Sequence, residues 1–280
     1  MTNYDSGPDG GMREAVLEAP AKLTLSLRVV GVRNDGFHLI DAEMITLALH
    51  DTLQLSPGPM ALSVSGPFAA GVPTTPDNLV ARALQLANRT AAVHIEKRIP
   101  NGGGLGGGSA DAAAVLRWAG FTDLAAASRL GADIPFCMVG GRARVRGIGE
   151  IVEPLPSAQR TDEPLDITLV VPPLHVSTPA VYRAWDELNN GSQRGTTAAV
   201  HNFGVGDSSG GVNDSSDDLN DLQAAALVVE PQLARWRDRI REATGVSPTL
   251  AGSGATWFLR GQHHIGDALR DATVIVTRSR

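Results

Sequence analysis

The sequence predicts an α+β fold divided into two lobes. Strand-like segments rich in aliphatic and β-branched residues alternate with alanine- and leucine-rich segments of helical periodicity. Residues 154–164 interrupt this alternation with prolines, polar residues and charges, which indicates a boundary between an N-terminal lobe (1–153) and a C-terminal lobe (154–280). In the first lobe, residues 102–108 carry six glycines in seven positions, directly before an alanine-rich segment.

The N-terminal lobe is predicted to open with a polar, glycine-rich and disordered segment, residues 1–14. Residues 16–30 are rich in β-formers and predict one long strand or a strand pair, and residues 38–55 predict another strand. A helix is predicted to begin at Pro76-Asp77-Asn78, because apolar residues follow at a spacing near 3.6. The other elements of this lobe are a strand at 93–99, helices at 109–118 and 124–130, and a strand at 142–148.

The C-terminal lobe is predicted to begin with a strand at 165–171, whose continuous apolar run is typical of a buried strand. Residues 189–218 are rich in Gly, Ser, Asn and Asp and predict a long mobile loop, to which we assign no function. Residues 219–243 predict a helical region with a break at Pro231. One or two strands at 249–260 and a final strand at 272–276 complete the lobe.

Composition limits the class of partner. The 280 residues carry a net charge of −6 with no long block of lysine or arginine, so nucleic acid is not an expected partner. No apolar run has the length of a membrane span or resembles the core of a signal peptide. Cys137 is the single cysteine, which rules out an intrachain disulfide and fits a protein of the reducing cytoplasm. We expect Cys137 to be a small buried residue.

The glycine-rich loop predicts a binding site for phosphate. Glycine permits positive φ and lets a ligand approach the backbone closely. A chain that passes from such a loop into a helix directs several N–H groups at one point, where the helix dipole also attracts anions. A flexible linker is the alternative, but linkers rarely lead straight into an alanine-rich helix that starts with Ser109 and Asp111.

Three common types of phosphate-binding loop match this stretch poorly or only in part. The Walker A pattern needs a lysine after its last glycine, whereas a serine follows Gly108. The dinucleotide pattern G-x-G-x-x-G is matched, as it is by any run this rich in glycine. However, Asp123, at the offset where that fold places an acidic residue, lies in a turn- and helix-like segment. The protein-kinase loop joins two strands, whereas a helix is predicted here.

The pattern from Pro100 to Ser109, P-x-x-x-G-L-G-G-G-S before an alanine-rich helix, resembles the phosphate loop of the GHMP small-molecule kinases. Further segments resemble the motifs of one branch of this family, in the order of that branch. They are A-P-A-K-L at 19–23, G-x-R-x-D-G-F-H at 31–38, G-A-D-I-P-F at 131–136, G-I-G-E at 147–150, S-T-P-A-V-Y at 177–182, N-D-L at 220–222 and G-S-G-A-T at 252–256. The branch acts on a cytidine-diphosphate-linked methylerythritol in non-mevalonate isoprenoid biosynthesis. The resemblance covers residues 16–260.

The resemblance implies a two-lobed kinase with its active site in the cleft between the lobes and with ATP as phosphate donor. Asn78 would contact adenine through its amide, although a helix N-cap is the alternative for this residue. Ser109 would cap the helix that follows the loop and offer its hydroxyl to phosphate. The residues implied to hold ATP are Asn78, Pro100, Asn101, Gly102, Gly103, Gly104, Leu105, Gly106, Gly107, Gly108, Ser109 and Ala110.

Mg²⁺ is the implied companion of ATP, and its ligands are left open. Asp111 would repel phosphate unless a cation intervened, so we place the metal near Asp111, with Ser109 as another candidate. A helix-start acid without a metal role explains Asp111 equally well. Gly107 stands where many GHMP kinases carry a serine that can contact the metal.

Lys22 and Asp133 are the candidate catalytic residues. Lys22 lies in an apolar strand, where an unpaired lysine costs free energy, and Asp133 has apolar neighbours. A structural ion pair would explain either residue alone. Together with the loop, the resemblance implies that Asp133 is the general base and that Lys22 orients the substrate hydroxyl and stabilises developing charge. Thr24 stands where the family commonly has asparagine.

The resemblance also implies a subsite for the cytosine base. Phe37 and Tyr182 would supply aromatic faces, and His38 would hydrogen-bond the edge of the base. Thr178 and Pro179 would form the far wall of the substrate pocket. The family usually has tyrosine at the position of Phe37, so one hydroxyl is lost. Core packing for Phe37 and a turn role for His38 are the alternatives.

The implied reaction is ATP-dependent phosphorylation of the 2-hydroxyl of 4-diphosphocytidyl-2-C-methyl-D-erythritol. A different GHMP kinase, acting on mevalonate-type substrates or isopentenyl monophosphate, is the first alternative. A nucleotide-binding protein without catalysis is the second, and the presence of both Lys22 and Asp133 argues against it. The oligomeric state is not predicted.

Overall fold

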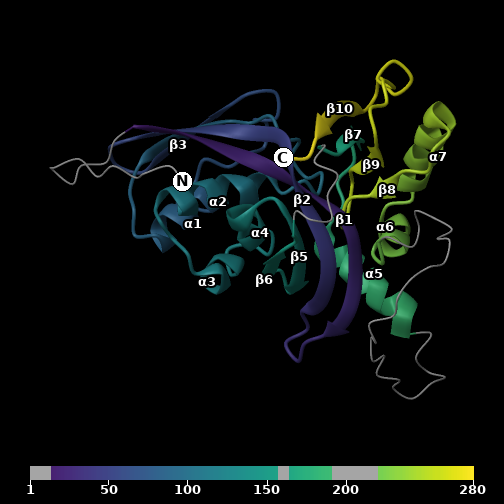
Figure 1. Cartoon of the computed structure of the whole chain (residues 1–280), viewed down its shortest axis with the longest axis horizontal. Coiled ribbons are helices and arrows are strands. Elements are labelled where there is room, and N and C mark those ends of the chain that lie inside the picture. The colour runs from purple at the N-terminus through teal and green to yellow at the C-terminus, as the bar shows by residue number, and fades with distance from the viewer. Residues whose placement is uncertain (1–13, 157–163, 191–219) are drawn as a thin grey trace.

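The computed structural model describes residues 14–156, 164–190 and 220–280, and these form two β-sheets with helices packed against them (Figure 1). The mixture of helices and sheets confirms the predicted α+β class. The predicted disordered segment 1–14 and the predicted loop 189–218 lie outside the described residues, except for residue 14 and for residues 189 and 190, which end a helix.

The first sheet contains six strands, in the order β3-β4-β2-β5-β6 with β1 paired to β2. The strands are β1 (Ala15–Val32), β2 (His38–Ser56), β3 (Ala61–Ser65), β4 (Ala92–Glu96), β5 (Arg142–Gly147) and β6 (Ile151–Pro154). The segment predicted as one strand or two is a single strand, β1, which pairs with β2 along almost its whole length. Its register shifts between Pro20 and Lys22, and this irregularity frees the Lys22 N–H to donate to the carbonyl of Leu105 at 3.0 Å.

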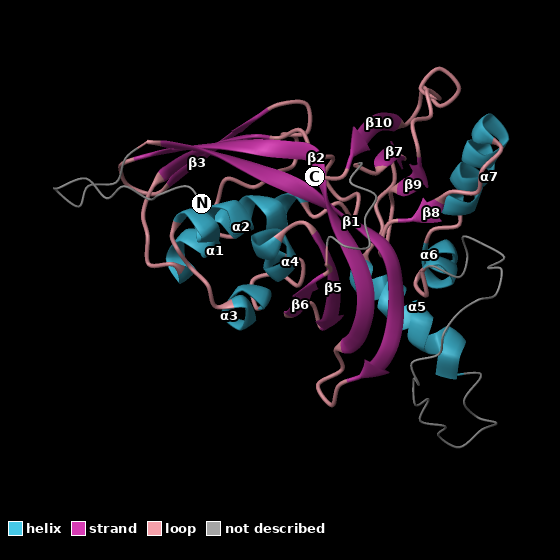
Figure 2. Ribbon diagram, in the orientation of Figure 1, coloured by secondary structure: helices cyan, strands magenta, loops and turns pink. Residues whose placement is uncertain are grey.

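Four helices accompany this sheet: α1 (Leu79–Leu86), α2 (Gly107–Trp118), α3 (Leu124–Ser128) and α4 (Ile134–Val139). Figure 2 shows α1, α2 and α4 gathered beside the β1–β2 hairpin. Helix α2 is buried on nearly all sides, because the alanine run at 112–114 lets its neighbours approach closely. This central position fixes the glycine-rich loop that precedes α2.

The second sheet has the order β10-β7-β9-β8 and is antiparallel throughout. Its strands are β7 (Asp166–Val171), β8 (Thr249–Leu250), β9 (Trp257–Arg260) and β10 (Thr273–Arg278). The helices of this half are α5 (Thr178–Asn190), α6 (Gln223–Val229) and α7 (Gln232–Thr244). The predicted break at Pro231 is confirmed, because Pro231 lies between α6 and α7.

The chain changes from one sheet to the other where the boundary is predicted. Strand β6 ends at Pro154 and β7 begins at Asp166. Two isolated β-bridges, between Leu27 and Asn220 and between Leu47 and Ser279, tie the halves together. The division into lobes at 1–153 and 154–280 stays a prediction.

Among the element boundaries that differ from the sequence prediction, two flank the glycine-rich loop. Helix α2 begins at Gly107 rather than Ser109, because Gly106 adopts a left-handed conformation (φ 70°) and serves as the N-cap residue. The prediction that Ser109 caps this helix is therefore wrong. The strand predicted at 93–99 ends at Glu96, since the N–H group of Ile99 donates to the Asp51 carboxylate at 2.8 Å.

Candidate active site

The glycine-rich loop packs directly against residues 252–256. A Cβ atom at Gly103 would lie 2.7 Å from the Thr256 hydroxyl oxygen. A Cβ at Gly104 would lie 2.9 Å from the carbonyl oxygens of both Ala251 and Gly254. Glycine is therefore required by close approach as well as by conformation. This contact brings the glycine-rich loop and the G-S-G-A-T motif at 252–256 together.

The loop ends at the N-terminus of α2. The N–H of Ala110 donates to the carbonyl of Gly106 at 2.8 Å and closes the first helical turn. The backbone N–H groups just before Ala110 have no partner within the helix, so they can bind an anion. Because α2 starts two residues earlier than predicted, Gly107 and Gly108 belong to this first turn and bring no side chain that could cover it.

The predicted catalytic residues are in contact. Lys22 Nζ lies 3.3 Å from Asp133 Oδ2, and the Lys22 side chain is 6% exposed whereas that of Asp133 is 32% exposed. Lys22 also donates to Thr24 Oγ1 at 3.2 Å, so threonine keeps a hydrogen bond at the position where asparagine is common. Asp133 precedes α4 and makes no capping bond with its side chain, which leaves the carboxylate to Lys22.

The pair lies against the loop. A Cβ at Gly106 would come within 2.8 Å of Lys22 Cγ, and a Cβ at Gly252 would lie 4.0 Å from Lys22 Nζ. Lys22 thus stands between the phosphate loop and the turn at 252–256, with Asp133 beside its ammonium group.

His38 and Tyr182 also meet, although they come from opposite halves of the chain. Their rings stack with centroids 4.6 Å apart and planes inclined by 29°. The pKa of Tyr182 is raised to about 12 by burial and by the negative charge of Asp133. Tyr182 is therefore within electrostatic range of the Asp133 carboxylate.

The remaining predicted substrate residues lie at the two ends of this region. Phe37 is 57% exposed, and the Arg33 guanidinium lies 5.7 Å from its ring centroid, so Phe37 is free of the core. Thr178 begins α5 and shares a hydrogen bond of 2.7 Å with Ser253, which joins α5 to the turn at 252–256. Pro179 is exposed in the first turn of α5.

Two residues beside His38 were not predicted. Asp186 Oδ1 lies 2.7 Å from His38 Nε2, and the Trp185 ring meets the His38 ring edge-on at 5.7 Å. Both follow Tyr182 at helical spacing in α5, so they share its face. That spacing was visible in the sequence once Tyr182 had been singled out.

Asn78 is the N-cap residue of α1. Its side-chain oxygen accepts from the Val80 N–H at 2.8 Å, and its amide nitrogen donates to the Pro73 carbonyl at 2.7 Å. The alternative assignment as a helix cap is confirmed. One amide hydrogen is left for a ligand, and the contact with adenine stays a prediction.

Asp111 is not placed to hold a metal at the loop surface. It is 3% exposed and its carboxylate pairs with Lys97 Nζ at 2.6 Å. Lys97 is 1% exposed and also pairs with the fully buried Asp51. Burial, together with the charge of Asp51, raises the pKa of Asp111 to about 7 against the opposing charge of Lys97. The expectation that Mg²⁺ lies beside Asp111 is therefore corrected.

This buried charge cluster of Lys97, Asp51 and Asp111 supports the loop at both ends. Asp51 accepts from the backbone that enters the loop, and Asp111 lies in the helix that leaves it. A Cβ at Gly107 would lie 3.3 Å from Lys97 Nζ. The sequence did contain a signal for Lys97, because it alternates in phase with the buried Val93 and Ile95.

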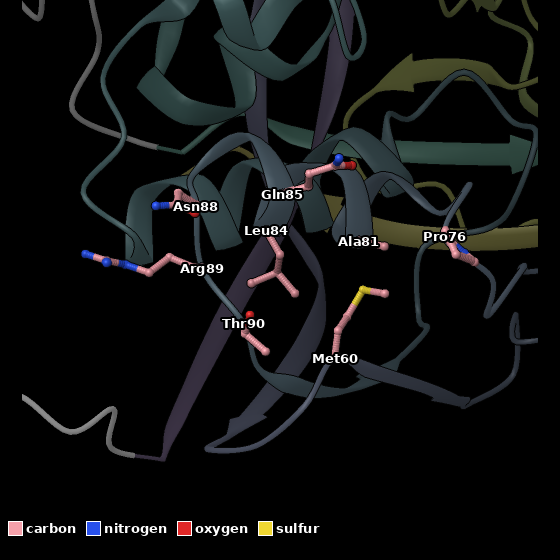
Figure 3. Close-up of a pocket in the computed structure, with 8 residues that line it drawn as sticks. All are labelled: Met60, Pro76, Ala81, Leu84, Gln85, Asn88, Arg89 and Thr90. Atoms are coloured by element: carbon pink, nitrogen blue, oxygen red, sulfur yellow. The ribbon is translucent and has the colours of Figure 1, made fainter.

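Other features lie outside the predicted site. A pocket of about 320 Å³ lies between α1 and the start of β3, and Figure 3 shows the residues that line it. None of the predicted site residues is among them. Cys137 is buried, as predicted, and this burial raises the pKa of its thiol to about 12. Among the described residues, no group of three or more His, Cys, Asp and Glu side chains could hold a metal, and no helix could span a membrane.

Comparisons with known proteins agree with this architecture. The family profile "GHMP kinases N terminal domain" matches residues 78–141, which include the loop and α2. A protein of Paracoccus denitrificans named 4-diphosphocytidyl-2-C-methyl-D-erythritol kinase is 41% identical over 244 residues, covering 86% of this chain and 84% of the relative. A protein of the same name from Pelotomaculum thermopropionicum is 35% identical, covering 93% of this chain and 96% of the relative.

Solved structures are also similar to this chain over most of its length. A crystal structure of 4-(cytidine 5'-diphospho)-2C-methyl-D-erythritol kinase matches with a TM-score of 0.66 and 30% identity, covering 95% of this chain and 100% of that one. Mevalonate kinase from L. major matches with a TM-score of 0.65, 95% and 96% coverage, but only 13% identity, which indicates the shared fold alone. The sequence relatives are similar over nearly their whole length. This chain therefore belongs to the 4-diphosphocytidyl-2-C-methyl-D-erythritol kinase family of the GHMP kinases.

Proposed function

We propose that the protein transfers the γ-phosphoryl group of ATP to the 2-hydroxyl of 4-diphosphocytidyl-2-C-methyl-D-erythritol. The observation that carries this proposal is the Lys22–Asp133 pair, with 3.3 Å between Nζ and Oδ2, held against Gly106 of the glycine-rich loop. Family membership supplies the identity of the alcohol.

The reaction needs positioning and charge compensation more than covalent help from the protein. As the substrate oxygen bonds to the γ-phosphorus, its proton passes to the Asp133 carboxylate. The bond between that phosphorus and the bridging oxygen breaks, and ADP leaves with the electron pair. Lys22 lies close enough to Asp133 to orient the hydroxyl and to offset the charge that develops on its oxygen.

The phosphates of ATP would lie at the start of α2, bound by backbone N–H groups from Gly102 to Ser109, since the N–H of Ala110 donates to the carbonyl of Gly106. The absence of side chains at Gly106 and Gly107 lets Lys22 and Lys97 approach the backbone of the loop closely. The described side chains do not build a cage for Mg²⁺, since Asp111 is paired with Lys97. We therefore infer that Mg²⁺ arrives with the phosphate oxygens of ATP as ligands.

The cytidine moiety would lie at the aromatic cluster of Phe37, His38 and Tyr182. Phe37 is exposed and free to stack on a base, and Tyr182 lies near Asp133. Thr178 and Pro179 would close the far side. A substrate without a base has no use for this platform, which favours the cytidyl alcohol over mevalonate or isopentenyl monophosphate.

The two sheets suggest lobes at 1–153 and 154–280, and the residues assigned to substrate come from both. We propose a cytoplasmic location, in keeping with the single cysteine.

The test is release of ADP from ATP in separate reactions with the cytidyl alcohol, mevalonate and isopentenyl monophosphate. We expect rapid release with the cytidyl alcohol alone. Faster release with either other acceptor would assign a different kinase activity, and tight ATP binding without turnover of any alcohol would indicate a binding protein.

A further inference from the structure

The imidazole ring of His38, the first residue of β2, packs against one face of α5. Tyr182 stacks on the ring at 4.6 Å, and Trp185 meets it edge-on at 5.7 Å with planes at 89°. Asp186 Oδ1 lies 2.7 Å from Nε2. These three residues occupy positions i, i+3 and i+4 of the helix, so one rigid surface sets the place, the plane and the rotation of the ring.

The contact with Asp186 determines which nitrogen of His38 carries hydrogen. An ionised carboxylate only accepts hydrogen bonds, so Nε2 must donate. In a neutral ring this leaves Nδ1 without a proton, as an acceptor. The His38 side chain is only 10% exposed, so little water can replace Asp186 as the partner of Nε2.

The contact also joins the two halves of the chain at the substrate subsite. His38 belongs to the hairpin that carries Lys22, and Asp186 belongs to the helix that begins at Thr178. Packing against the Tyr182 and Trp185 rings opposes rotation of the His38 side chain. The hydrogen bond to Asp186 then selects one orientation of the imidazole ring.

We propose that Asp186 is a positioning residue for the nucleobase subsite, acting on the substrate through His38. This inference rests on the proposed function, since it concerns how the cytidyl alcohol is held. Asp186 makes the ring a preorganised wall of the subsite, with Nε2 committed to the protein and Nδ1 left for recognition. Without Asp186, the Nε2–H group loses its partner and the ring samples other orientations.

Kinetics of Asp186→Ala test the proposal. We expect KM for the cytidyl alcohol to rise about tenfold, the effect of one lost hydrogen bond to a charged group. The values of kcat and of KM for ATP should stay within about twofold, because the catalytic pair and the loop are untouched. In Asp186→Asn the side-chain oxygen can still accept from Nε2, so KM should recover most of the way. Glu187→Ala, at an exposed neighbour in α5, is the matched control.

A double-mutant cycle and a spectroscopic measurement show whether Asp186 acts through His38. In a His38→Phe background, Asp186→Ala should raise KM no further. Nitrogen-15 NMR of the wild-type protein should show the Nε2–H form of His38 above pH 7.5, and Asp186→Ala should give mixed forms. The proposal is overturned by an unchanged KM, by an equal rise of KM in the His38→Phe background, or by a His38 ring protonated on Nδ1 alone. The NMR result does not depend on turnover, so it separates failure of this proposal from failure of the proposed function.

Discussion

Lys22 and Gly106 are in such close contact that a single methyl group at position 106 would lie 2.8 Å from Lys22 Cγ. This contact fixes the ammonium group of the catalytic pair relative to the first turn of α2. The Lys22 N–H also donates to the carbonyl of Leu105, so both the backbone and the side chain of Lys22 hold to the loop. These two contacts fix Lys22, the partner of Asp133, relative to the glycine-rich loop.

Gly106→Ala should lower kcat by at least tenfold. The new Cβ would displace Lys22, and the left-handed φ of 70° would be strained with a side chain. Steady-state kinetics at saturating ATP and alcohol give the value. Gly266→Ala is the control, because a Cβ there meets no atom within 4 Å. Wild-type kcat in Gly106→Ala would show that the contact does not matter for catalysis.

Asp133→Asn should lower kcat by ~100-fold or more and leave ATP binding near normal, since the amide cannot accept the hydroxyl proton. Calorimetric titration with ATP provides the binding constant, and an ADP-release assay provides kcat. A kcat close to that of the wild type would show that Asp133 is not the general base.

Asp111→Asn should stabilise the protein at neutral and alkaline pH. The pKa of Asp111 is raised from 3.8 to about 7 in the folded protein, so its ionisation opposes folding. This cost is absent below pH 4, grows between pH 4 and 7, and is constant above pH 7. The asparagine keeps the shape without the charge, and Lys97 keeps Asp51 as its partner.

Thermal unfolding at several pH values measures this effect. The Tm of Asp111→Asn should exceed that of the wild type by several degrees above pH 7, because each kcal/mol of stability shifts Tm by roughly 2–4 °C in a chain of this size. The difference should shrink toward pH 4. Asp267→Asn, at a fully exposed carboxylate, should show no such pH-dependent gain. A Tm difference that grows toward acid pH would contradict the argument.

Tyr182→Ala should raise KM for the cytidyl alcohol by roughly 5- to 150-fold, the effect of losing ~1–3 kcal/mol of stacking. Tyr182→Phe should change KM little, because the ring is kept. Since the pKa of Tyr182 is about 12, its hydroxyl stays neutral and should impose no pH dependence on KM up to pH 10. Equal KM values in the alanine and phenylalanine variants would exclude a stacking role.

Most elements could be predicted because their periodicity reflects the face they bury. The single long strand β1, the break at Pro231 and the alanine-rich helix α2 are examples. The start of α2 was missed by two residues, since a helix that begins with a left-handed glycine carries no side-chain cap for the sequence to reveal.

The candidate site also contains contacts that the sequence can reveal and one that it cannot. The contact between Lys22 and Asp133 was predicted, because each residue is a charge in apolar surroundings and needs a partner. The same reasoning applied to Lys97 and Asp51 would have found the buried charge cluster, and with it the true partner of Asp111. Asp186 could not be found this way, because it is partly exposed and its role depends on which ring α5 meets.

The identity of the phosphorylated product tests the central claim most directly. Wild-type protein, ATP and 4-diphosphocytidyl-2-C-methyl-D-erythritol should be incubated together and the product examined by mass spectrometry and phosphorus-31 NMR. We predict one new phosphomonoester on the 2-hydroxyl, formed in equal amount with ADP. Release of ADP without a phosphorylated cytidyl product, or a phosphate on another hydroxyl, would contradict the account.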